Sequence, residues 1–327
     1  MKPRFSVIMP LYNKAPYVRK AVESVVGQTF ADWELIVVDD CSSDASAAVV
    51  EQVVDSRIRV VRLEENGGVS AARNRGVAES TAPFICFLDA DDWWEPTFLE
   101  EMAGLIAHHP GAGIYGTSYY IVKNGRKRMA PIGVDEGFTE GEINYCRVYA
   151  KTLCMPLWTG AVCMPRTVFD EAGGFPVGIK LGEDFLLWVH IALKHSVVLL
   201  NKPLSNYTQD VDVTYRGTHH LHEPQHHMLW HLGDLETFEQ TNADYKQMVD
   251  NLRTYGLWSY HLDSYHHKAA ATELAKVDWS RQARKTRRLY RLPLWLARCR
   301  QRVLLTGSRV KQRLLSSALI KSSKQGE

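Results

Sequence analysis

Aspartates stand in closely spaced sets where two apolar, strand-like segments of this chain end. Asp39 and Asp40 follow one such segment, and Asp89 and Asp91 follow another. An Asp-x-Asp at a strand end supplies hard carboxylate oxygens that suit Mg²⁺ or Mn²⁺, and such an ion can bridge the two phosphates of a diphosphate. Taken alone, however, the motif favours a plainer interpretation, namely a turn that ends the strand, with Asp92 capping the next helix.

The segments that must position these acids alternate between strand-like and helix-like. Short, β-branched runs predict strands, and amphipathic stretches between them predict helices. The predicted strands are 5–9, 33–38, 57–63 and 84–88, and the predicted helices are 16–27, 45–54 and 69–79. Continuous apolar strands that are separated by helices indicate a buried parallel sheet. Because ligands of such sheets bind at the carboxyl ends of the strands, all four aspartates lie where a ligand is expected.

The second half of the chain has a less regular pattern. Segments 114–122 and 126–130 flank Asn124-Gly125, a dipeptide that is typical of a tight hairpin turn. Two further segments, 161–164 and 197–200, are strand-like, and 185–194 predicts a helix that follows two acids. From about residue 221 onward the pattern predicts helices.

Several motifs, in their order and spacing, resemble those of a family 2 glycosyltransferase. The matching stretches are FSVIMPLYN at 5–13, ELIVVDDCSSD at 34–44, NGGVSAARNRG at 66–76, FLDADD at 87–92, GAVCMPRTVFDEAGGF at 160–175 and GED at 182–184. The resemblance covers roughly residues 4–215 and implies the GT-A (nucleotide-diphospho-sugar transferase) fold. That fold is α/β, with a Rossmann-like mixed sheet flanked by helices, and here we expect a helical C-terminal extension after it.

The resemblance assigns nucleotide-sugar binding to the first half. Asp39 or Asp40 would accept a hydrogen bond from the ring N–H of the base, while an Asx-turn with the serines that follow is the alternative for one of them. Arg73 would reach the base or the phosphates, the alternative being a solvated helix face. Pro10 and Tyr12 would begin the loop that covers the base and the ribose.

The same resemblance places a divalent metal, Mn²⁺ or Mg²⁺, at the Asp-x-Asp motif. Asp89 would hold the ribose and a metal-bound water, and Asp91 would be the direct metal ligand. His219 or His220 is a candidate for a third ligand, and a His-rich surface helix is the alternative. The nearby sequence His-Glu-Pro-Gln-His at 222–226 is not a zinc protease motif, because Pro224 cannot lie inside the required helix.

The chemical step needs a base that accepts a proton from the acceptor hydroxyl. In the family a carboxylate after the Gly-Gly-Phe segment has this role, and here the corresponding pair is Glu183-Asp184. We predict that Asp184 is the base and that Glu183 positions the acceptor. The alternative is that both acids only favour the start of their helix through its dipole.

Charge is distributed unevenly along the 327 residues. The formal net charge is +2, but residues 281–327 hold 14 Lys and Arg and one acid, Glu327. Apolar residues such as Trp295 are interleaved with these bases. Such a segment can lie on an anionic membrane surface, and we favour this over nucleic-acid binding, which we do not expect, and over an inert tail.

Composition limits the cellular setting. No run of about 18 apolar residues occurs, so we expect no membrane-spanning helix, and the short apolar run at 5–9 is not a signal peptide. Six cysteines without a Cys-x-x-Cys pair suggest reduced thiols. We therefore expect a cytoplasmic protein that is peripheral at the inner face of the plasma membrane.

Together these features predict three segments and one function. We expect a GT-A domain at 1–218, with its nucleotide-sugar half at about 1–110 and its acceptor half at about 111–218, then a helical extension at 219–280 and a basic amphipathic tail at 281–327. The predicted enzyme is a metal-dependent, inverting, hexosyltransferase-type glycosyltransferase. It would move a sugar from a nucleotide-diphosphate sugar, with a UDP-sugar favoured, to a glycan or lipid-linked acceptor in lipopolysaccharide, capsule or exopolysaccharide synthesis.

Two other functions stay open at this point. A sugar-nucleotide nucleotidyltransferase shares a similar sheet but opens with a Gly-rich loop, whereas the first strand here runs into Pro10-Leu11-Tyr12-Asn13. A catalytically inactive nucleotide-sugar binding module would not need the base, and the presence of Asp89, Asp91 and Asp184 argues against it.

Overall fold

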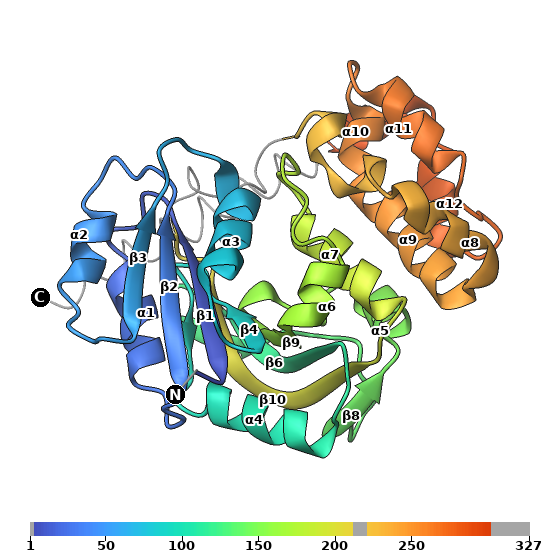
Figure 1. Cartoon of the computed structure of the whole chain (residues 1–327). Coiled ribbons are helices and arrows are strands. Elements are labelled where there is room, and N and C mark those ends of the chain that lie inside the picture. The colour runs from blue at the N-terminus through green and yellow to red at the C-terminus, as the bar shows by residue number, and fades with distance from the viewer. Residues whose placement is uncertain (1–2, 212–220, 302–327) are drawn as a thin grey trace, which may run out of the picture. The chain divides into compact units, whose positions relative to one another are not determined.

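The computed structural model describes residues 3–211 and 221–301 (Figure 1). The chain divides into two compact units, Met1–Val249 and Asp250–Glu327. The boundary expected at residue 218 lies outside the described residues. The predicted three-part division therefore stays a prediction, and each compact unit is described by itself.

The first unit is built on one ten-stranded mixed sheet with the strand order β3-β2-β1-β4-β9-β6-β10-β5, to which β7 and β8 attach at its sides. The first four strands of this order are parallel, and β9 runs antiparallel to both of its neighbours. They are β1 (Phe5–Leu11), β2 (Trp33–Asp39), β3 (Ile58–Arg62), β4 (Phe84–Phe87) and β9 (Val162–Pro165). The four predicted parallel strands are confirmed, with ends that differ by at most two residues.

Helices cover both faces of the parallel strands. Phe5, Val7 and Met9 of β1 share a core with α1 (Val18–Val26) and α4 (Phe98–His108). The opposite face carries α3 (Gly68–Glu79), while α2 (Ser46–Glu51) follows β2. A Cβ at Gly76 of α3 would lie 2.4 Å from Ile8, so only glycine allows α3 to approach the sheet this closely.

The second half of the first unit adds the strands that complete the sheet. The predicted hairpin at Asn124-Gly125 is confirmed, with strands β6 (Ile114–Lys123) and β7 (Arg126–Met129). β10 (Val197–Thr208) extends well beyond the predicted 197–200, because it pairs with β6, β8 (Glu140–Ile143) and β5 (Trp93–Trp94) along its length.

Three helices lie beside this half of the sheet. They are α5 (Tyr145–Thr152), α6 (Arg166–Glu171) and α7 (Glu183–Ala192). Phe87 of β4 contacts three aromatic rings from this region, those of Phe169, Phe175 and Trp188. This aromatic cluster fixes the start of α7 near the carboxyl end of β4. The short helix α8 (Phe238–Thr241) lies further along the chain, and α9 (Ala243–Gly256) follows it and continues past the unit boundary.

The second unit is helical in its described part, as predicted for the C-terminal extension. It holds the end of α9, α10 (Trp258–Leu262), α11 (His267–Leu274) and α12 (Arg284–Tyr290), drawn in orange shades in Figure 1. Arg253 is fully buried in it and lies 3.7 Å from Asp250 and 3.3 Å from Glu273. Since a buried charge needs partners, these acids account for an arginine inside this unit.

No helix of the described residues is long and apolar enough to cross a membrane. All six cysteines fall within the described ranges, and each is a free thiol.

Candidate active site

Arg73 is the residue that joins the two halves of the site. Its Nη2 donates to Asp89 Oδ1 at 2.8 Å, and its Nη1 donates to Glu183 Oε1 at 3.0 Å. Its side chain is 4% exposed, so the structure does not place it on a solvated helix face. Burial opposes the charge of Arg73, but the two carboxylates outweigh burial and raise the pKa of the guanidinium. Arg73 therefore stays a cation between the end of β4 and the start of α7.

The next residue, Asn74, fixes the turn that supports this arginine. Its side-chain Oδ1 accepts the N–H of Phe175 at 2.9 Å, and its Nδ2 donates to the carbonyl of Phe175 at 2.8 Å. The Phe175 ring then lies under Arg73, with the guanidinium carbon 4.9 Å from the ring centroid. Two of the motifs that carried the family resemblance, at 66–76 and 160–175, thus meet through one amide side chain.

The predicted acid pair begins α7. Gly182, which precedes it, has φ +83°, and a Cβ there would lie 2.2 Å from the sulfur of Met228. Glycine is therefore required for both its conformation and its space. The turn at Gly182 points the side chains of Glu183 and Asp184 back toward the carboxyl edge of the sheet, where Arg73 and Thr159 contact them.

The two acids of this pair have different partners. Asp184 Oδ1 accepts the N–H of Phe185 at 2.7 Å, and Asp184 Oδ2 accepts the hydroxyl of Thr159 at 2.9 Å. Burial, reinforced by Asp184, raises the pKa of Glu183 to about 7 despite its contact with Arg73. Burial also raises the pKa of Asp184, while Arg73 and the Thr159 hydroxyl oppose this effect. Carboxyl groups with raised pKa values suit proton transfer near neutral pH.

At the end of β2 the two acids bond to backbone amides. Both carboxylate oxygens of Asp40 accept hydrogen bonds from the start of α3: Oδ1 from the N–H of Gly67 at 2.7 Å and Oδ2 from the N–H of Gly68 at 2.9 Å. Asp39 Oδ1 accepts the N–H of Ser42 at 3.1 Å, which is the Asx-turn considered from the sequence. Among the described residues no hydrogen bond reaches Asp39 Oδ2, so Asp39 keeps an oxygen for a ligand.

At the end of β4, Asp91 bonds to a cation from another loop. Its Oδ2 lies 2.5 Å from Nζ of Lys14, and both side chains are partly exposed. Lys14 follows β1, as does Tyr12, whose side chain is 47% exposed at the same edge of the sheet. Pro10 is half-buried within β1 itself. The structure thus places these predicted donor-side residues along one edge.

Asp92 does not cap a helix, contrary to the plainer interpretation of its sequence. α4 begins several residues later, after β5, and its N-cap is Thr97. Asp92 is 2% exposed and accepts the N–H of Thr208 at 2.8 Å and the indole N–H of Trp158 at 3.1 Å. Burial, together with Asp91 and Asp89, raises the pKa of Asp92 well above its usual range. Asp92 therefore ties β10 to the segment that contains Trp158.

Residues 158–160 connect the parts of the site, and two of them, Trp158 and Thr159, were not singled out from the sequence. Trp158 donates to Asp92, Thr159 donates to Asp184, and the carbonyl of the residue that follows accepts the indole N–H of Trp94 at 2.6 Å. No local pattern reveals these contacts, because each joins residues at least 25 positions apart. The one signal in the sequence is that Trp158 and Thr159 directly precede the segment at 160–175 that carries the family resemblance.

The carboxylates of Asp89 and Asp91 are the groups that would hold the divalent metal implied by the Asp-x-Asp motif. Among residues 3–211 and 221–301, no group of three or more His, Cys, Asp or Glu side chains is arranged to hold a metal ion. His219 and His220 lie outside the described residues. Asp91 already accepts a cation, the Lys14 ammonium, and Mg²⁺ is commonly bound by one or two carboxylates with substrate phosphates completing its shell. Asp91 and Asp89 therefore fit a cation that a diphosphate would share.

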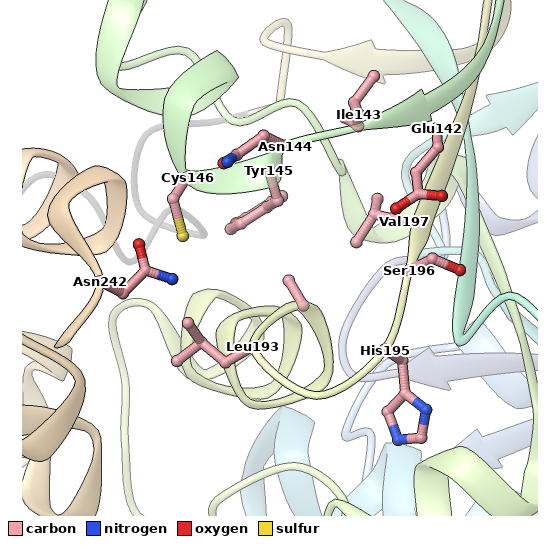
Figure 2. Close-up of a pocket in the computed structure, with 11 residues that line it drawn as sticks. Glu142, Ile143, Asn144, Tyr145, Cys146, Leu193, His195, Ser196, Val197 and Asn242 are labelled. Atoms are coloured by element: carbon pink, nitrogen blue, oxygen red, sulfur yellow. The ribbon is translucent and has the colours of Figure 1, made fainter.

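A pocket of about 400 Å³ also lies in the first unit, between β8, α5 and the end of α7. Figure 2 shows the side chains of Cys146 and Asn242 pointing toward it, while the ring of His195 points away. None of the predicted site residues that the structure describes lines this pocket. It is separate from the acid and arginine cluster described above.

The acids at the ends of β2 and β4, Arg73 and the acid pair of α7 thus gather at the carboxyl edge of the parallel strands, and comparison with known proteins identifies the class. The family profile described as "Glycosyl transferase family 2" matches residues 6–160. The UDP-Glc:alpha-D-GlcNAc-diphosphoundecaprenol beta-1,3-glucosyltransferase WfgD of Escherichia coli is 32% identical over 200 residues, which cover 60% of this chain and 72% of WfgD. The chain therefore belongs to glycosyltransferase family 2.

Other relatives are matched over a smaller part of their own length. Glycosyltransferase GlyA of Streptococcus pneumoniae is 36% identical over 214 residues, covering 62% of this chain but 30% of GlyA. The chain spans 30% to 40% of the length of several of the curated relatives it matches.

Solved structures of low identity share the fold. S. aureus TarS 1-349 in complex with UDP-GlcNAc aligns with a TM-score of 0.64 at 22% identity, covering 84% of this chain and 80% of that one. The mannosyltransferase PcManGT from Pyrobaculum calidifontis, solved with GDP-Man and Mn²⁺, aligns with a TM-score of 0.55 at 18% identity, covering 95% of this chain and 81% of that one. The GT-A fold implied by the sequence is confirmed.

Proposed function

We propose that this chain transfers a sugar from a nucleotide-diphosphate sugar to a hydroxyl of a glycan or lipid-linked acceptor in cell-envelope polysaccharide synthesis. The observation that carries the proposal is the position of Arg73, which bonds at once to Asp89 on the donor side and Glu183 on the acceptor side. The activity that the name of WfgD states, with a UDP-glucose donor and a lipid-linked acceptor, supports a nucleotide-sugar donor and a lipid-linked acceptor for this chain.

The acid pair at the start of α7 supports an inverting reaction. The acceptor oxygen would bond to the anomeric carbon from the side opposite the leaving group, as the bond from that carbon to the diphosphate oxygen breaks. The nucleoside diphosphate leaves with the electron pair, and Asp184 takes the hydroxyl proton. Glu183, held by Arg73, would position the acceptor.

The donor would lie along the carboxyl edge of β1, β2 and β4. Asp39 Oδ2 would accept the N–H of the base, and Pro10 and Tyr12 would cover the base and ribose. A divalent cation, Mn²⁺ or Mg²⁺, would neutralise charge on the leaving diphosphate, with Asp91 and Asp89 as the protein groups that hold it. The UDP-GlcNAc bound to TarS supports the proposal of a UDP-sugar donor, and the Mn²⁺ bound with GDP-Man to PcManGT supports the proposal of a metal.

A thermal-shift titration of the full chain with UDP- and GDP-sugars, with and without Mn²⁺, tests this proposal. A ligand that binds only the native state stabilises it by about 2.7 kcal/mol at 100 times its Kd. We expect a UDP-sugar to raise the Tm, more so with Mn²⁺, and to give nucleoside diphosphate when an acceptor is added. No shift with any nucleotide sugar would contradict donor binding. A shift without any transfer or donor hydrolysis would favour an inactive binding module.

We also propose that residues 281–327 hold the protein at the inner face of the plasma membrane. In the described part of this segment, Trp295 is 67% exposed and Leu296 is 39% exposed, among basic residues. Because Tyr290 Oη donates to the carbonyl of Thr254 at 2.8 Å, deletion from 281 would open the second unit. Deletion of 302–327 is therefore the cleaner variant, and it should weaken co-sedimentation with anionic vesicles. Unchanged sedimentation after this deletion and after Trp295→Ser would contradict the proposal.

A further inference from the structure

The second unit contains a pocket of about 510 Å³, bounded by residues of α10, α11 and α12 and by Trp279. This volume is within the range of small-molecule sites. Its apolar part includes Leu274, which is 6% exposed, and the rings of Trp279 and Tyr290, whose centroids are 5.1 Å apart. The hydroxyl of Tyr290 is already bonded to the carbonyl of Thr254. The lining is therefore largely aromatic and aliphatic surface.

The charges that line this pocket are all of one sign. Arg287, in the last turn of α12, and Arg291, one turn later, carry this charge, and no carboxylate or side-chain amide of the described residues lines the pocket. His261 also lines it, and burial, together with His267 and Arg298, lowers the pKa of that imidazole. The two guanidiniums thus give the pocket a permanent positive charge.

No acid of the described part of this unit neutralises these arginines. Its four acids bond elsewhere: Asp250 to the N–H of Asp278, Asp263 to His266, Glu273 to Arg253 and Lys276, and Asp278 to Ser280. Among the described residues no hydrogen bond or ion pair reaches the side chain of Arg287 or Arg291. The only acid after residue 301 is Glu327. Two adjacent, uncompensated guanidiniums over an apolar surface are a feature that a ligand with an anionic head would complement.

We propose that this pocket binds a lipid phosphate, with Arg287 and Arg291 on the phosphate and the first part of the apolar chain over Trp279, Tyr290 and Leu274. Guanidinium groups bond phosphate oxygens strongly because the hydrogen bonds are charge-assisted and fit two oxygens at once. A sugar or a nucleobase would need several hydrogen-bond acceptors for its own donors, and the described lining offers no carboxylate or amide, only imidazole nitrogens such as Nδ1 of His261. The idea that this pocket serves a lipid-linked acceptor rests on the proposed function. The binding of a lipid phosphate to the pocket does not depend on that function.

The test uses the full chain and a water-soluble probe, farnesyl phosphate below its micelle concentration, followed by titration calorimetry. Farnesol and inorganic phosphate are the two partial ligands. We expect farnesyl phosphate to bind at least ten-fold more tightly than either, and the double variant Arg287→Gln/Arg291→Gln to lose at least ten-fold in affinity. The matched control, Arg281→Gln/Arg284→Gln, removes the same charge from residues that do not line the pocket and should change affinity less than two-fold.

Each other outcome would overturn the proposal in a recognisable way. Equal affinity for inorganic phosphate would mean an anion site without a lipid, and equal affinity for farnesol would mean an apolar pocket without a role for the arginines. An equal loss in the control variant would mean diffuse electrostatic attraction. The variant Arg287→Lys/Arg291→Lys keeps the charge but loses the planar guanidinium groups, so it should bind farnesyl phosphate with intermediate affinity. It replaces the Gln variant in the test if the Gln variant is unfolded. UDP-sugar stabilisation should be the same in all variants, so failure of donor binding in the parent would count against the proposed function alone.

Discussion

The acids at the ends of β2 and β4 resemble each other in sequence but differ in what they bond to. Asp40 bonds to two backbone amides at the start of α3, whereas Asp89 and Asp91 bond to the side chains of Arg73 and Lys14. A backbone amide cannot leave without unwinding its helix, but a long cationic side chain can exchange one anion for another. We therefore expect a charged ligand to recruit the acids at β4, and we expect Asp40 to contribute to the fold rather than to binding.

Asp184 lies between these two cases. One of its oxygens bonds to a backbone amide and the other to the hydroxyl of Thr159, and no cationic side chain within 3–211 and 221–301 bonds to it directly. Its position is fixed by the fold, yet each oxygen retains a lone pair for a further donor. A carboxylate held in this way suits a base, which must stay in place while its proton changes.

The largest effect should come from Asp184→Asn. Asn keeps the size of the side chain but cannot take up a proton, so turnover should fall by about 10²–10⁴, the usual contribution of general-base catalysis. Donor affinity, measured by thermal shift, should stay within a few-fold of the parent. Glu183→Gln should reduce turnover less. Near-parent turnover in Asp184→Asn with an inactive Glu183→Gln would show that the base is the other acid, and two active variants would contradict both roles.

A smaller effect, on binding, is expected from Asp91→Ala. The change removes the partner of Lys14 and the proposed metal ligand, so UDP-sugar affinity measured with Mn²⁺ should fall by about ten-fold or more, equivalent to at least ~1.4 kcal/mol. Without the metal, parent and variant should bind alike. Equal affinity of the two proteins in the presence of Mn²⁺ would exclude Asp91 as a ligand and would leave the diphosphate to Lys14.

Asp40→Ala should affect stability rather than ligand binding. It leaves the N–H groups of Gly67 and Gly68 without their acceptor, and loss of a helix cap costs about 1–2 kcal/mol. Urea unfolding should show this loss. UDP-sugar affinity at a temperature where the variant is folded should stay close to that of the parent. A stable variant with weak donor binding would reverse the contrast between the two strand ends.

The parallel part of the fold was predictable because its signals are local. Each of β1 to β4 is a short, mostly apolar run, and β2 and β4 end where aspartates begin, so the carboxyl edge follows from the sequence alone. β5 and β8 were not predicted, because Trp93–Trp94 is only two residues long and Glu140–Ile143 lacks an apolar pattern. Both are strands only because β10 pairs with them from more than 50 residues away.

The acids of the candidate site could be proposed from the sequence, but their partners could not. Asp89 and Asp91 were chosen for their place at a strand end, and Glu183 and Asp184 were chosen from the family resemblance; their roles stay predictions. The partner of Asp91, by contrast, is 77 residues away in sequence, and Arg73 and Glu183 are 110 residues apart. Hydrogen bonds over such separations depend on how helices and strands pack, which no spacing rule within one motif contains.

The smallest predicted effect concerns Thr159, whose hydroxyl bonds Asp184 Oδ2 at 2.9 Å and whose side chain is 1% exposed. This hydrogen bond favours the ionised carboxylate and lowers the pKa of Asp184 against the effect of burial. Thr159→Val keeps the shape of the side chain and removes the hydroxyl. The pKa of Asp184 should then rise, and since the base must be ionised, the acid limb of the turnover–pH profile should move to higher pH. Above that limb, turnover should stay within about ten-fold of the parent, because the base itself remains.

The comparison with Thr159→Ser separates this effect from a packing defect. Serine keeps a hydroxyl at the same position and loses a methyl group from a buried site, so it should lower the Tm while leaving the acid limb near its parent pH. Valine should leave the Tm close to that of the parent and move the acid limb to higher pH. If both variants lose turnover equally at every pH, with no displacement of the profile, Thr159 only fills space beneath α7. If the limb moves to lower pH in Thr159→Val, then Asp184 is not the group whose ionisation controls the rate. Glu183 would then be the base, and Asp184 would be an acid of the fold.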